Sequence, residues 1–106
     1  MIVRIVEMQF KPENVETFKA LFEERKEKIR GFPGCRYLEM LQGTAGNNNV
    51  FSTYSHWDSE EDLENYRYSE LFADTWKATK VLFSARAKAI RFTPVSYTHL
   101  TLPTKA

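Results

Sequence analysis

The sequence is short of several features that would mark a particular kind of protein. Its 106 residues include one cysteine, Cys35, which excludes an internal disulfide, and no Cys/His spacing is typical of a zinc site. No apolar run approaches the roughly 20 residues needed to cross a bilayer, and the N-terminus lacks the layout of a signal peptide. These absences predict a cytoplasmic protein without a metal.

Charge of one sign is also lacking. Fifteen Lys and Arg residues stand against fourteen Asp and Glu residues, which gives a net charge of +1. Nucleic acids and anionic membranes both select a clustered positive excess, so neither is expected as a partner. The length and the 42% hydrophobic composition are typical of one globular domain with a modest core. This domain is assigned to residues 1–93.

Hydrophobic periodicity predicts alternating strands and helices. Residues 2–10 are rich in Ile and Val and predict a strand, and residues 13–30 carry apolar side chains at helical spacing. The later predicted elements are strands at 35–42 and 51–57 joined by a Gly/Asn-rich turn, helices starting near 58–59 and 69, and a strand at 87–93. The order is β-α-β-β-α-β, which indicates an α+β, ferredoxin-like plait with an antiparallel four-stranded sheet.

Residues 51–76 hold both tryptophans and seven of the fifteen aromatic side chains. Strand alternation places Thr53, Ser55 and Trp57 on one face and Tyr54 and His56 on the other. A helix start directly after Trp57 makes this segment a corner where sheet and helix meet. We expect any pocket to lie at this corner.

The predicted sheet has helices on one face only. Val3, Ile5 or their neighbours must lie on the other face, because both faces of the first strand are apolar at several positions. Burying apolar surface stabilises by roughly 25 cal/mol per Å². Pairing of two sheets therefore predicts an obligate homodimer.

Three features of the sequence resemble the antibiotic-biosynthesis-monooxygenase family of small dimeric α/β-barrel proteins. They are the order of elements, the loop GFPGC at 31–35, and the segment WDSE at 57–60 followed by Tyr66, Ser69 and Phe72. The resemblance covers about residues 1–92 and implies a pocket between sheet and helices that Trp57 lines. The superfamily includes cofactor-free monooxygenases of quinols and polyketides, haem-degrading enzymes, isomerases and members without known activity, so the fold leaves the reaction open.

The sequence departs from this family in its histidines and asparagines. Many members have a histidine nine residues after the tryptophan, where this chain has Tyr66. Haem-degrading relatives combine an asparagine on the first strand with a helix histidine as iron ligand. Here the first asparagine is Asn14, and the helix after Trp57 has no histidine, although a tyrosinate can also bind haem iron. Haem degradation is therefore the least favoured activity, and no cofactor is expected.

The resemblance favours a cofactor-independent monooxygenase that oxidises a small quinol or phenol with O2. Such chemistry needs a buried, oriented substrate and a group that takes its proton. The expected catalytic residues are Trp57, Tyr66 and His56, of which His56 is the candidate base with an ordinary pKa of about 6.5. The expected substrate-binding residues are Thr53, Ser55, Tyr54, Phe72 and Trp76.

Two alternatives remain open from the sequence. If the strand at 51–57 is regular, Tyr54 and His56 point away from Trp57 and serve the dimer interface instead. If Phe72, Trp76 and Phe83 fill the space between sheet and helices, the protein is a non-catalytic ligand-binding or stress-related barrel. A buried polar group facing Trp57 would favour the enzyme.

Residues 94–106, PVSYTHLTLPTKA, contain no acidic residue and resemble a translated sequencing-adapter tail. We expect this segment to be non-native, and His99 is left out of the site. The alternative is a genuine extension with strand propensity that lies along a partner subunit.

Overall fold

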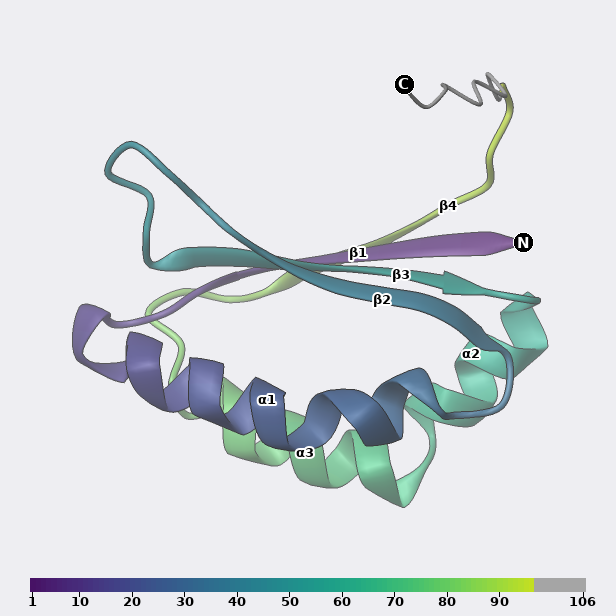
Figure 1. Cartoon of the computed structure of the whole chain (residues 1–106), viewed down its shortest axis with the longest axis horizontal. Coiled ribbons are helices and arrows are strands. Elements are labelled where there is room, and N and C mark those ends of the chain that lie inside the picture. The colour runs from purple at the N-terminus through teal and green to yellow at the C-terminus, as the bar shows by residue number, and fades with distance from the viewer. Residues whose placement is uncertain (97–106) are drawn as a thin grey trace, which may run out of the picture.

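A four-stranded antiparallel sheet with helices on one face forms the molecule (Figure 1). The computed structural model describes residues 1–96, so most of the segment predicted as a tail, including His99, lies outside the described residues. The elements are β1 (Ile2–Gln9), η1 (Pro12–Asn14), α1 (Val15–Arg30), β2 (Cys35–Gln42), β3 (Val50–Trp57), α2 (Glu60–Arg67), α3 (Glu70–Lys80) and β4 (Lys88–Phe92). The predicted ferredoxin-like α+β fold is confirmed. The first long helix begins at Val15 instead of residue 13, because Pro12–Asn14 forms a 3-10 turn.

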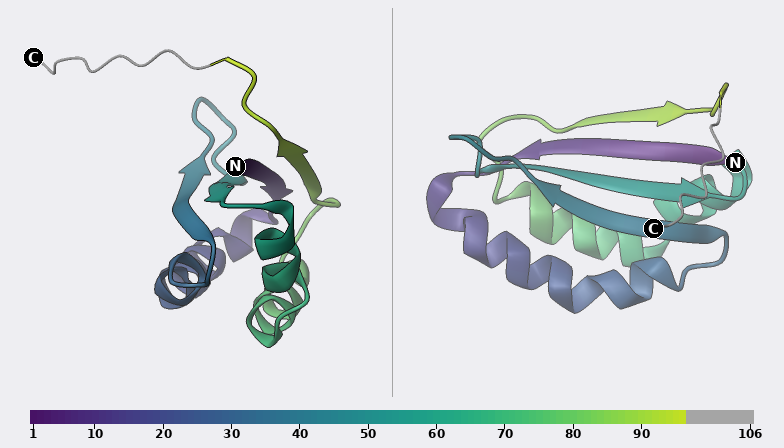
Figure 2. Two further views of the ribbon diagram at one scale, coloured as in Figure 1. Left: turned by 90° about the vertical axis from the view of Figure 1, so that its right-hand side faces the viewer. Right: turned by 45° about the horizontal axis from the view of Figure 1, so that its top comes forward.

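The strand order is β2-β3-β1-β4, with every neighbouring pair antiparallel. The central strand β1 places Ile5 opposite Tyr54 of β3 and opposite Ile90 of β4. Because they are directly paired, these three residues share one face of the sheet, the face that no helix covers. The second view in Figure 2 brings this uncovered face toward the viewer. The large side chains on this outer face that are substantially exposed are Tyr37, Leu41, Ile90 and Phe92.

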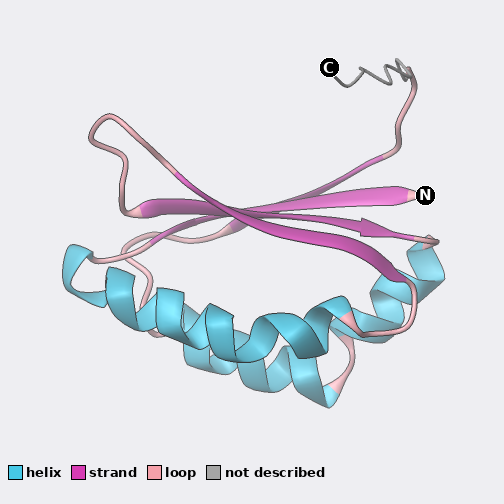
Figure 3. Ribbon diagram, in the orientation of Figure 1, coloured by secondary structure: helices cyan, strands magenta, loops and turns pink. Residues whose placement is uncertain are grey.

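The core lies between the sheet and the helices and consists of two clusters. One contains Phe10, Phe18 and Phe51, whose rings contact one another at centroid distances between 4.1 and 5.6 Å. The other surrounds Trp57 and Leu63 at the corner where β3 meets α2. Figure 3 shows the helices together on the same side of the sheet. None of the helices within residues 1–96 is long and apolar enough to cross a membrane.

Two serine caps place the helices that follow β3. The backbone N–H of Asp62 donates to Ser59 Oγ at 3.1 Å, and the N–H of Phe72 donates to Ser69 Oγ at 3.1 Å. Each cap satisfies a backbone donor that the first helical turn leaves without a partner. The neighbouring Asp58 does not cap α2, because its carboxylate pairs with the Arg36 guanidinium at 2.7 Å.

Gly34 is the glycine on which this corner depends. Its φ is +92°, and a Cβ at this position would lie 2.4 Å from Cβ of Asp62 on the capped helix. We expect Gly34→Ala to lower the free energy of unfolding by about 3 kcal/mol, since it adds a steric clash to the cost of a left-handed backbone. Urea unfolding measures this loss.

Gly46 provides the matched control for this substitution. Its φ is +90°, and a Cβ added there would have no heavy atom within 4 Å beyond its chain neighbours. Gly46→Ala should therefore cost only the backbone term of about 1 kcal/mol. Equal losses in the two variants would contradict the close contact between the loop and α2.

Candidate functional site

A small cavity of about 70 Å³ lies between the sheet and the helices. The strands contribute Arg4 and Thr53, and the helices contribute Tyr66, Phe72, Trp76 and Thr79, together with apolar side chains. Among its lining residues within the described chain there is no Asp, Glu or His. The cavity is thus aromatic and apolar, with a few hydroxyl groups and one cation.

Tyr66 is the residue that joins the cavity to the core corner. Its ring stacks on Trp57 at a centroid distance of 4.9 Å and meets the edge of Phe72 at 5.3 Å. Burial raises the pKa of Tyr66 to about 12. Its phenol is therefore neutral at pH 7 and can act as a hydrogen-bond donor.

Trp57 lies behind Tyr66 and is 1% exposed. Its indole N–H donates to Ser55 Oγ at 3.0 Å, which satisfies the one polar atom of the ring. Neither Trp57 nor Ser55 is among the residues that line the cavity. Their position supports the ring of Tyr66, whereas Thr53, Phe72 and Trp76 line the cavity directly.

Arg4 is the charged residue of the cavity, and it was not among the site residues predicted from the sequence. It occupies the helix-facing side of β1, where the neighbouring positions Ile2 and Val6 are buried. Burial lowers the pKa of Arg4 to about 10, and the positive charges of Arg67 and Arg91 act in the same direction. Within residues 1–96 its side chain makes no ion pair and no hydrogen bond.

The partner that Arg4 does have among the described residues is aromatic. Its guanidinium carbon lies 5.7 Å from the centroid of Phe72, and Arg67 approaches the same ring at 5.7 Å. A cation–π contact offsets part of the cost of burying a charge, but a cation held this way keeps its hydrogen-bond donors available. The arrangement is suited to an anion. The sign of this site in the sequence is that Arg4 is a charged residue among the otherwise apolar even-numbered positions of the first strand, 2, 6 and 8.

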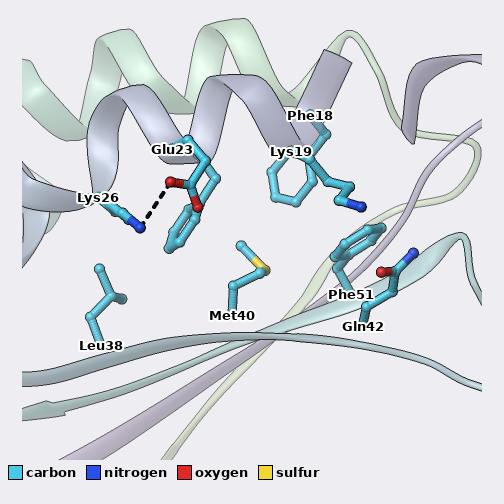
Figure 4. Close-up of a pocket in the computed structure, with 9 residues that line it drawn as sticks. Phe18, Lys19, Glu23, Lys26, Leu38, Met40, Gln42 and Phe51 are labelled. Carbon is cyan, nitrogen blue, oxygen red and sulfur yellow. Dashed lines mark ion pairs between the residues drawn. The ribbon is translucent and has the colours of Figure 1, made fainter. Parts of the chain in front are cut away.

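Two wider clefts flank this cavity, one on each side. Between α1 and β2 lies a cleft of about 390 Å³, where Leu38 and Met40 point from β2 toward α1 (Figure 4). The charges at its rim are largely paired, since Lys26 Nζ lies 2.8 Å from Glu23 Oε1. Between α3 and β4 lies a groove of about 450 Å³, which shares Arg4, Phe72 and Trp76 with the cavity.

Tyr54 and His56 lie on the outer face of the sheet, as the alternation along β3 predicted. The rings of Tyr37, Tyr54 and His56 form a cluster with centroid distances between 5.0 and 6.0 Å. The structure therefore does not bring these two residues together with Trp57, Tyr66 or the cavity. Nε2 of His56 is buried and has no hydrogen-bond partner within residues 1–96.

Cys35 is an unreactive thiol by its surroundings. The residue is buried, and burial raises its pKa, which keeps the sulfur in the protonated form. It packs in the cluster around Trp57 and lies outside the cavity.

The architecture and the cavity together define a ferredoxin-like α+β protein with an aromatic site between sheet and helices. The model of the family described as antibiotic biosynthesis monooxygenase matches residues 1–78. The chain belongs to this family, which confirms the resemblance read from its sequence. The match includes Arg4, Trp57 and Tyr66 but ends before Lys80, Arg86 and β4.

Solved structures share the same fold. An antibiotic biosynthesis monooxygenase superposes with a TM-score of 0.82 at 19% identity, covering 91% of this chain and 100% of that chain. A candidate antibiotic biosynthesis monooxygenase from Nitrosomonas europaea gives the same values. The Rv0793 protein of Mycobacterium tuberculosis has a TM-score of 0.81 at 14% identity, covering 91% and 96% of the two chains. No curated protein sequence matches the chain.

Arg4 carries a stability cost that can be measured. Replacing its half-buried, unpaired charge with an apolar side chain of similar length, Arg4→Met, should raise the free energy of unfolding by about 1 kcal/mol. Arg91→Met is the matched control, since Arg91 pairs with Glu60 at 2.6 Å and with Glu64. That control should lose up to about 1 kcal/mol in the same urea titration. A loss in Arg4→Met larger than in the control would contradict an unpaired Arg4.

Proposed function

We propose that the protein is a cofactor-independent monooxygenase that oxidises a small phenol or quinol with O2 in the cavity between sheet and helices. The observation that carries this proposal is that the cation of Arg4 and the neutral phenol of Tyr66 line the same aromatic cavity. Reaction with oxygen in such a mechanism begins from the substrate anion. Arg4 stabilises that anion, and Tyr66 donates a hydrogen bond to it.

The chemistry balances without a cofactor. Anthrone, a ketone whose CH2 group is activated by the carbonyl group and the two flanking rings, loses a proton from that CH2 group to give an anion of phenolate character, which transfers an electron to O2. The substrate radical and superoxide combine to a peroxide anion, which takes up a proton and loses water to leave a second carbonyl group, so that one oxygen atom enters the product and the other leaves as water. The substrate supplies all the electrons. The protein contributes binding, orientation and stabilisation of charge.

The source of the anion follows from the residues that surround it. Because no carboxylate or histidine of the described chain lines the cavity, the proton leaves to solvent or to a group outside it. This favours substrates whose hydroxyl is already acidic, since a nearby cation lowers the pKa of a phenol. His56, the base expected from sequence, lies on the opposite face of the sheet, where it is suited to an interface.

We propose in addition that two copies pair through the outer faces of their sheets. Members of the family are generally dimeric. Support comes from the apolar and aromatic side chains on this face and from the buried Nε2 of His56, for which a second copy would supply a partner. Tyr54 and His56 then belong to the dimer interface, and the cavity of each copy lies on the far side of its sheet.

Oxygen uptake tests the oxygenase proposal. The protein, without added cofactor, is mixed with anthrone and a panel of quinols, and O2 consumption and carbonyl product are measured together. Arg4→Gln should lower kcat/KM by about 100-fold, because it removes the charge that stabilises the anion. Tyr66→Phe should lower it by about 10-fold, and Trp57→Phe less, since Trp57 only supports the ring of Tyr66.

The pH profile adds a second readout to this experiment. With its pKa near 12, Tyr66 keeps its proton at neutral and mildly alkaline pH, so activity should rise with the ionisation of each substrate and shift with the substrate's pKa. A profile fixed at one pKa for all substrates would indicate a base on the protein. If no substrate of the panel leads to O2 consumption, the oxygenase proposal is contradicted and the non-catalytic ligand-binding function replaces it.

Paired substitutions test the dimer. Ile90 is 54% exposed on the outer face, whereas Val81 is 68% exposed after α3 and away from this face. Ile90→Glu should shift the protein to monomers in analytical ultracentrifugation, because it buries a charge between the sheets. Val81→Glu should leave the sedimentation unchanged. A monomeric wild type, or a dimer that survives Ile90→Glu, would contradict pairing through this face.

A further inference from the structure

We propose that the groove between α3 and β4 binds a carboxylate at one end of the substrate, so that the ligand of this site is an aromatic acid. This inference rests on the proposed function for the position of the ring, and it adds the substrate's charge and its orientation. The groove adjoins the cavity through three shared residues, Arg4, Phe72 and Trp76.

The first support is the charge of the groove. Its lining includes Arg4, Arg67, Lys80 and Arg86, and no Asp or Glu of the described chain. Arg67 is partly neutralised by Glu64, 3.9 Å away, which also pairs with Arg91. Arg4, Lys80 and Arg86 make no ion pair within residues 1–96. The chain as a whole is nearly neutral, so this concentration of unbalanced cations is a local feature of the groove.

The second support is the aromatic surface between these cations. The rings of Phe72 and Trp76 are nearly parallel, at 8° and a centroid distance of 5.9 Å, and Phe83 meets Trp76 edge-on at 5.5 Å. Flat apolar walls beside guanidinium and ammonium groups suit a ligand that is aromatic over most of its length and anionic at one end.

Size gives the orientation of the ligand. A cavity of about 70 Å³ has space for the hydroxyl edge of one ring, whereas the groove of about 450 Å³ lies within the usual range for small-molecule sites. The ionisable hydroxyl therefore points inward to Arg4 and Tyr66, and the carboxylate stays outside, near Lys80 and Arg86.

The cleft on the other side of the cavity does not offer the same binding. Its cations, Lys19 and Lys26, are balanced by Glu16 at 3.7 Å and Glu23 at 2.8 Å. An anion there would have to displace these carboxylates. The asymmetry assigns the anionic end of the ligand to the α3–β4 side.

Equilibrium binding of two matched probes tests this site. The probes are 6-hydroxy-2-naphthoate and 2-naphthol, which differ only in the carboxylate, and both are titrated into the full chain by calorimetry at about neutral pH without oxygen. We expect the naphthoate to bind at least about ten times more tightly at low salt, and this preference should shrink as salt screens the charges. Equal affinities would overturn the proposal.

Variants of the groove test which residues cause the preference for the naphthoate over 2-naphthol. The double variant Lys80→Gln/Arg86→Gln should reduce the affinity ratio at least about fivefold while 2-naphthol binds as before, which also shows that the variant is folded. Lys77→Gln is the matched control, because Lys77 is a cation of α3 that does not line the groove. A preference that persists in the double variant, or falls equally in the control, would overturn the assignment.

The two proposals fail in different ways. Binding without oxygen does not depend on catalysis, so a charge preference in a protein that consumes no O2 would support the groove and remove only the oxygenase. Oxygen uptake that is indifferent to the carboxylate, together with equal affinities, would remove the groove and leave the oxygenase.

Discussion

Arg4 is a cation held on the apolar side of the central strand without a counter-charge among residues 1–96, and much of the site follows from this arrangement. Its same-face neighbours on β1, Ile2 and Val6, belong to the core, so its side chain is half-buried and lies between the cavity and the groove beside α3. The ring of Phe72 faces it, and Tyr66 stands beside the same cavity. Charged groups whose pKa is shifted by burial cluster at functional sites, which makes Arg4 a candidate site residue.

The corner between β3 and α2 keeps this arrangement in place. Trp57 fills the corner, its indole N–H is satisfied by Ser55, and the ring of Tyr66 stacks on it. The cap at Ser59 fixes where α2 begins, and therefore which turn of the helix carries Tyr66 to the cavity. Trp57 therefore lies outside the cavity lining and contacts the cavity residue Tyr66 from behind.

The fold could be predicted from the sequence because its signals are local. Alternation in β3, helical spacing in α1 and the serine caps each act within a few residues, and they specify the element order.

The site was predicted only in part, since Tyr66 and Phe72 line the cavity whereas Trp57 stands behind it. Arg4 and the groove could not be predicted from the sequence. The position of a charged strand residue beside a cavity depends on how α3 packs across the sheet. The cations of the groove come from β1 and from residues 67–86, and only the folded chain brings Arg4 together with the others.

The absence of a carboxylate or histidine from the described cavity lining and the unpaired cations of the groove favour the same kind of substrate. Under the proposed oxygenase function, a cavity whose described lining has no carboxylate or histidine would favour substrates that ionise readily or arrive already charged. Cations beside the ring serve both needs, since they attract the anion and lower its basicity. Specificity would then depend on the substrate's charge as much as on its shape. The part of the domain beyond the family match, with Lys80 and Arg86, would determine which aromatic acids enter.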